Sequence, residues 1–166
     1  MKEILNSYAA YNVWANTRII NTILPLDKEK QMMPVRNSFP GVYTTLYHIW
    51  DAESIWWQRL KLVETISIPS KDQSELPILS VCNKLLQQNK EWEDWVQKST
   101  EAAIQHEFIY QNSKKQSFKQ PVWQMLHHIF NHGTYHRGQI VTMLHHLEVK
   151  KIPPTDYIVF SRGKSN

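Results

Sequence analysis

Four stretches of the chain, each roughly 20 residues long, carry apolar side chains at the 3.6-residue spacing of an amphipathic helix. They cover residues 3–24, 41–63, 75–98 and 121–147. Proline falls mostly at the edges of these stretches: Pro25 follows the first, Pro121 occupies the first turn of the fourth, and Pro153 prevents its continuation. The pattern predicts an all-α fold, a four-helix bundle with long connections.

Between the third and fourth predicted helices, residues 104–119 break the helical period. His106, Phe108 and Tyr110 alternate with polar neighbours, and residues 111–113 have the composition of a turn. We therefore expect a short hairpin in this connection. A length of 166 residues without an internal repeat suits one domain, so we expect a single domain over residues 1–166.

The formal charge of +4 is spread along the chain rather than gathered into a stripe of Lys and Arg. Nucleic-acid binding needs such a stripe or a known module, so we expect no nucleic-acid partner. No apolar stretch approaches about 18 residues and the first residues are too polar for a signal peptide, so we expect no membrane association and a cytoplasmic location. The single cysteine, Cys82, excludes an internal disulfide and lies in an apolar helical run, which favours a buried, inert thiol.

Six of the eight histidines fall within the fourth predicted helix. At about 100° per residue, His136 lies in the middle of the apolar stripe and His132 lies about 40° to one side, whereas His127 and His145 point toward solvent. Two imidazoles one turn apart on a core-facing stripe can converge on one metal ion. The alternative is a pair of core histidines satisfied by hydrogen bonds, which is costlier because each ring brings a donor and an acceptor that need partners.

The second predicted helix offers a third histidine. His48 lies on a flank of that helix, which can face the fourth helix in a bundle, and the spacing is equally compatible with a surface position. His128 and Gln139 border the ligand side of the fourth helix, where they can orient ligands or substrate or make ordinary edge contacts.

Three further polar residues stand near these positions. Asn12 and Asn89 lie on the apolar stripes of the first and third helices, where hydrogen bonding within the bundle is favoured over a role in a pocket. Arg137 follows His136 by one position and points about 100° away from it, so we expect it in a salt bridge or a subunit contact.

Four segments resemble the DinB/YfiT family, the DNA-damage-inducible bundle family of metalloenzymes. They are, in order, YNVWANTRII at 11–20, TLYHIWDAESIWWQRL at 45–60, VWQMLHHIFNHGTYHRGQI at 122–140 and PPTDYIVF at 153–160. The match covers nearly the whole chain, and the NHGTYHRGQ run is specific to the family. The resemblance implies that His48, His132 and His136 are the metal ligands.

The resemblance also implies one divalent ion, zinc or nickel, a small-molecule substrate and a homodimer, for which seven tryptophans in a small bundle add a reason. We expect a thiol-dependent S-transferase that joins a low-molecular-weight thiol to a small electrophile. The alternatives are a metal-dependent hydrolase, because a bound ion lowers the pKa of water toward about 7, and a non-catalytic metal-binding stress-response protein. All three need the same protein ligands. Because free histidine titrates near about 6.5, metal binding is expected to weaken below about pH 6.

Overall fold

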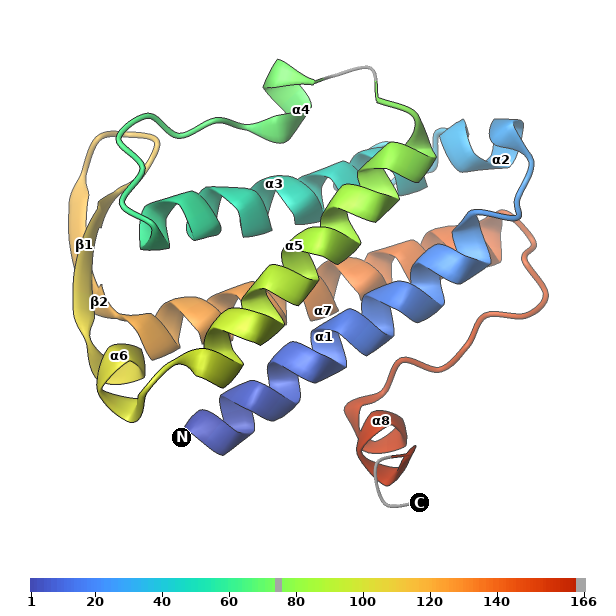
Figure 1. The fold of residues 1–166 in the computed structure, drawn as a ribbon. Coiled ribbons are helices and arrows are strands. Elements are labelled where there is room, and N and C mark those ends of the chain that lie inside the picture. Colours follow the sequence, from blue (N-terminus) through green and yellow to red (C-terminus); the bar gives the residue numbers. More distant parts are fainter. Residues whose placement is uncertain (74–75, 164–166) are drawn as a thin grey trace.

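The computed structural model describes residues 1–73 and 76–163. Four long helices form a bundle (Figure 1): α1 (Lys2–Ile23), α3 (Val42–Leu60), α5 (Ile78–Lys98) and α7 (Val122–His146). α1 and α3 each pack against both α5 and α7. The predicted all-α bundle is therefore confirmed.

Shorter elements lie in the connections and after α7. They are α2 (Lys28–Met32), α4 (Pro69–Asp72), α6 (Glu101–Gln105) and α8 (Tyr157–Gly163). Periodicity did not predict them, because one or two helical turns are too short to show a stripe. Within the described part of the chain, no helix combines the length and the apolar character needed to cross a membrane.

The expected hairpin is present between α5 and α7. Strands β1 (Glu107–Gln111) and β2 (Ser117–Pro121) pair antiparallel, with Tyr110 opposite Phe118. The turn lies later than predicted and passes through Lys115, whose φ of 59° is left-handed. In Figure 1 the hairpin stands at one end of the bundle, beside the end of α3 and the start of α7.

Two predicted helix boundaries are wrong. The second helix ends at Leu60 rather than at residue 63, and Leu62 takes a left-handed φ of 55° that breaks the helix. The third helix begins at Ile78, directly after Pro77, because proline favours an extended conformation before it and a helix start after it. Its predicted first residue, Glu75, lies outside the described residues.

The interior is divided by a layer of buried polar side chains. One apolar cluster, which includes Ile19, Leu46 and Ile140, lies toward one end of the bundle, and a second, which includes Trp92 and Leu126, lies toward the other. Along each long helix, buried polar residues lie between the residues that belong to the two clusters. They are Asn12, Asn16, Glu53, Asn89 and Arg137.

These polar residues form one hydrogen-bonded network across all four helices. Glu53 accepts from the side-chain amides of Asn12, at 3.0 Å, and of Asn89. Asn16 donates to Asn89 Oδ1 at 2.7 Å. Arg137 Nη1 donates to Asn12 Oδ1 at 2.6 Å and to Asn16 Oδ1 at 3.2 Å. The network therefore links α1 to each of the other three long helices, and α3 to α5, by directional contacts inside the core.

The position of Arg137 corrects the expectation of a salt bridge or a subunit contact. Its side chain is 2% exposed, because a turn of 100° from His136 directs it toward α1 and not toward solvent. Gly133 leaves room for it, since a Cβ there would lie 3.1 Å from Arg137 Nη1 and 3.0 Å from Asn12 Oδ1. Burial raises the pKa of Glu53 to about 7, and the two amide hydrogen bonds and the charge of Arg137 oppose that rise.

The seven tryptophans do not supply the surplus apolar surface that we expected. Trp50 and Trp92 are buried and the others are half-buried. Cationic side chains cover several of the rings, as Arg18 covers Trp14 at 5.0 Å from the ring centroid. The tryptophan content therefore gives no support to a dimer.

We predict that Glu53→Ala lowers the free energy of unfolding by about 3–5 kcal/mol. The substitution leaves the buried side-chain amides of Asn12 and Asn89 without their acceptor and removes the negative charge near the buried Arg137 guanidinium. Glu53→Gln, which keeps an acceptor oxygen, should cost less. Urea denaturation measures both. The matched control is Glu64→Ala, at an exposed glutamate. A loss in Glu53→Ala as small as in this control would contradict a network that holds the helices together.

Candidate metal centre

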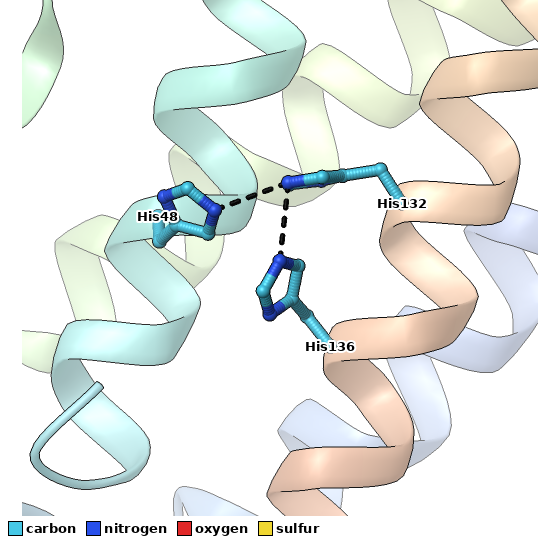
Figure 2. Close-up of side chains that lie close together, drawn as sticks. All are labelled: His48, His132 and His136. Atoms are coloured by element: carbon cyan, nitrogen blue, oxygen red, sulfur yellow. Dashed lines mark hydrogen bonds between the residues drawn. The ribbon is translucent and has the colours of Figure 1, made fainter. Parts of the chain in front are cut away.

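Three histidine side chains from two helices point toward one another (Figure 2). His48 comes from α3, and His132 and His136 lie one turn apart on α7. His132 Nε2 is 3.1 Å from the Nε2 atoms of both His48 and His136. One ligand atom from each of the three lies within 4.8 Å of the others. Nitrogens that bind one ion tetrahedrally at about 2.0–2.1 Å are about 3.3 Å apart, so the spacing suits a single ion.

Phe39 covers one side of the histidine cluster. Its ring stacks on His48 with centroids 4.1 Å apart, and meets His136 edge-on at 5.6 Å. The chain turns into α3 at Gly41, where φ is 120° and a Cβ would lie 2.7 Å from the Met33 carbonyl oxygen. Glycine at this turn therefore allows the connection to lay Phe39 over the cluster. Our sequence reasoning missed Phe39, for which the adjacent proline and glycine were the available signal.

Gln139 fixes the orientation of His136. His136 Nδ1 and Gln139 Oε1 are 2.7 Å apart. The amide nitrogen of Gln139 is directed to Ser38 Oγ at 3.0 Å and to the Tyr135 hydroxyl at 3.2 Å, which leaves its oxygen as the acceptor for His136. Nδ1 of His136 thus carries the proton, and the lone pair of its Nε2 faces the other two rings.

The electrostatics of the cluster favour neutral rings. Burial, with a smaller contribution from the charge of the neighbouring histidines, lowers the pKa of His48 to about 4 and that of His132 to about 3. Burial also lowers the pKa of His136, although the hydrogen bond that this ring donates to Gln139 raises it in part. The three rings are therefore uncharged near neutral pH.

The hydrogen bonds of His48, His132 and His136, here called the trio, do not support the alternative that they are ordinary core histidines. Among the described residues, the three histidines hydrogen-bond one another and one further side chain, that of Gln139. Three uncharged imidazoles that face one another present nitrogen lone pairs to a common centre. A single proton placed between the rings could hydrogen-bond only some of these lone pairs. A divalent cation satisfies them together, so the donor set fits a metal ion.

The other candidate residues lie further from this centre. His128 is exposed, its ring centroid is 5.8 Å from that of His132, and it meets Trp56 edge-on at 5.5 Å. Asn12 hydrogen-bonds Glu53 and Arg137 in the buried network, which is the structural role favoured for it, and it bonds no histidine. Cys82 is fully buried, and burial raises the pKa of its thiol to about 12.

Comparison with known proteins identifies the family of the chain. The chain is 29% identical over 153 residues to Protein DinB of Bacillus subtilis (strain 168), in an alignment that covers 89% of this chain and 87% of that protein. The model of the DinB family matches residues 1–164. The protein therefore belongs to the DinB family.

Proposed function

We propose that the protein is an enzyme that binds one divalent ion, zinc or nickel, through the Nε2 atoms of His48, His132 and His136. The observation that carries the proposal is the convergence of three neutral nitrogens on one centre. Within the described part of the chain, no carboxylate or thiol joins this group. Three neutral ligands leave the charge of the ion uncompensated and at least one coordination position open, as in catalytic zinc sites.

A pocket beside the trio supports catalysis over a sealed, structural ion. Its volume is about 320 Å³, and Phe39, Tyr43, Tyr47, His48 and Asp51 are among the residues that line it. His48 therefore belongs both to the proposed ligand set and to the wall of a pocket that can admit a small molecule.

The reaction that we propose is the transfer of a low-molecular-weight thiol to a small electrophile. When bound, the ion supplies the positive charge that lowers the pKa of the thiol and so produces a thiolate nucleophile. The thiol releases its proton to solvent, a carbon–sulfur bond forms, and the leaving group departs with its bonding electron pair. Cys82 is buried and far from being ionised, so the thiol comes from outside the chain. We also propose a homodimer, on family resemblance alone.

We predict that His132→Ala and His136→Ala each abolish stoichiometric metal binding and that His48→Ala weakens it. Gln139→Leu should weaken binding by about ten- to one-hundredfold, because the Nδ1 proton of His136 loses its acceptor. Elemental analysis and competition with a chelator measure these losses. His145→Ala, at an exposed histidine on the same helix, is the control. Undiminished metal in the His136→Ala protein would remove the basis of the proposed site.

We predict that metal affinity holds to lower pH than ordinary histidines would allow. The metal binds the neutral imidazole, and a lowered pKa extends the neutral form to lower pH. With the pKa of His48 at about 4 and that of His132 at about 3, affinity should stay constant from about pH 8 to about pH 5.5 and fall only below about pH 5. A competition assay corrected for protonation of the chelator tests this. A decline that begins near about pH 6.5 would show that the rings titrate as free histidine does.

We predict that the cobalt-substituted protein develops a sulfur-to-cobalt charge-transfer band when cysteine or another small thiol is added. The His136→Ala protein treated with cobalt should show no such band. If thiols leave the spectrum unchanged while a panel of esters or amides is hydrolysed, the proposed transferase is wrong and a hydrolase replaces it. If thiols leave the spectrum unchanged and neither panel reacts, the non-catalytic alternative replaces it.

A further inference from the structure

A second and larger pocket lies at the end of α3 next to the hairpin. Its volume is about 580 Å³. Apolar side chains from three segments form much of its wall: Ile55 from α3, Leu62, Ile66 and Ile68 from the loop after it, and Ile109 from β1. Gln58 holds the loop in place, because its side-chain amide exchanges two hydrogen bonds of 2.8 Å with the backbone of Ser67. The pocket is therefore built into the fold.

One cationic side chain, Arg59, lines this pocket beside its apolar wall and without a protein counter-ion. Its Cζ atom is 4.4 Å from the centroid of the Trp56 ring and 5.2 Å from that of Tyr110. In residues 1–73 and 76–163, no carboxylate forms an ion pair with Arg59, and its buried Nε has no hydrogen-bond partner. Glu64 also lines the pocket but is exposed and unpaired with Arg59. A partly buried guanidinium without an acceptor is costly, so this pocket suits an anionic ligand.

Aromatic contacts connect this pocket to the proposed metal centre. Trp56, which supports Arg59, meets the His128 ring at 5.5 Å, and the His128 ring lies 5.8 Å from that of His132. On α3, Arg59 follows His48 by 11 positions, which is about three turns and places both on the same side of the helix. A ligand in the pocket thus lies on the side of α3 that carries the histidine.

We propose that this pocket binds the carboxylate of a small organic acid with an apolar body. The planar guanidinium of Arg59 matches a carboxylate through two parallel hydrogen bonds, and the aliphatic walls contact the hydrocarbon part. A phosphate ester fits less well, because Arg59 is the one basic residue among the described residues of the wall. The role of the acid as substrate rests on the proposed function, whereas its binding at Arg59 does not require the metal.

The test compares hexanoate with hexanamide, which has the same body without the charge. Calorimetric titration of the wild-type protein should give a smaller Kd for hexanoate. Arg59→Met should raise the Kd for hexanoate by about ten- to one-hundredfold and leave that for hexanamide unchanged, while Arg59→Lys should recover part of the loss. Unchanged hexanamide binding shows that the pocket of the Arg59→Met protein is intact. Arg162→Gln, at an exposed arginine on α8, is the control.

Equal Kd values for hexanoate and hexanamide in the wild-type protein would overturn the inference, as would undiminished hexanoate binding by Arg59→Met. The same titration with the His136→Ala protein separates this inference from the proposed function. Retained hexanoate binding by that protein supports a site at Arg59, whether or not the histidines prove to bind a metal ion. Loss of hexanoate binding in His136→Ala would assign the carboxylate to the ion and contradict a site at Arg59.

Discussion

The hydrogen bonds between Arg137 and the two asparagines of α1 are the contact on which the arrangement of the site depends. Arg137 directly follows His136, so the direction of its side chain into the core sets the rotation of α7. With α7 rotated in this way, His132 and His136 face α3. Glu53 lies in the same network, five positions after His48, and constrains α3 in the same manner. Buried polar contacts have strict geometry, and these keep two helices in register at the place where their histidines meet.

The donor set explains why the proposed centre can be partly buried. Neutral imidazoles cost much less to remove from water than carboxylates. Burial in the bundle, to which Phe39 contributes at His48, holds the pKa of His48 and that of His132 well below the ordinary value. Because all three proposed ligands are neutral, the protein does not neutralise the charge of a bound ion. A thiolate complements that charge at the ion, and Arg59 adds a second positive group beside an apolar wall. Both features favour anionic ligands over neutral ones.

Periodicity predicted those features that depend on a single helix. The apolar stripes gave four long helices close to their observed bounds, and angular position on α7 brought His132 and His136 to one side. His48 needed the tertiary structure, because its flank position is compatible with a core or a surface location. The short helices have too few turns to show an apolar stripe. The placement of Phe39 over the histidines depends on contacts between segments, and Pro40 and Gly41 indicate only that the chain turns there. Glu53 lies among the buried residues of α3, and a carboxylate on an otherwise apolar helix face is the signal by which the sequence could have indicated the buried network.

The most direct test of the account is X-ray absorption spectroscopy of the purified protein loaded with zinc or with nickel. A centre built on three histidines predicts a first shell that contains three nitrogens, at about 2.0–2.1 Å for zinc, with the outer-shell scattering of three imidazole rings. The His136→Ala protein should lose that pattern. A first shell of oxygen alone, or one with fewer than two imidazoles, would contradict a centre built on His48, His132 and His136.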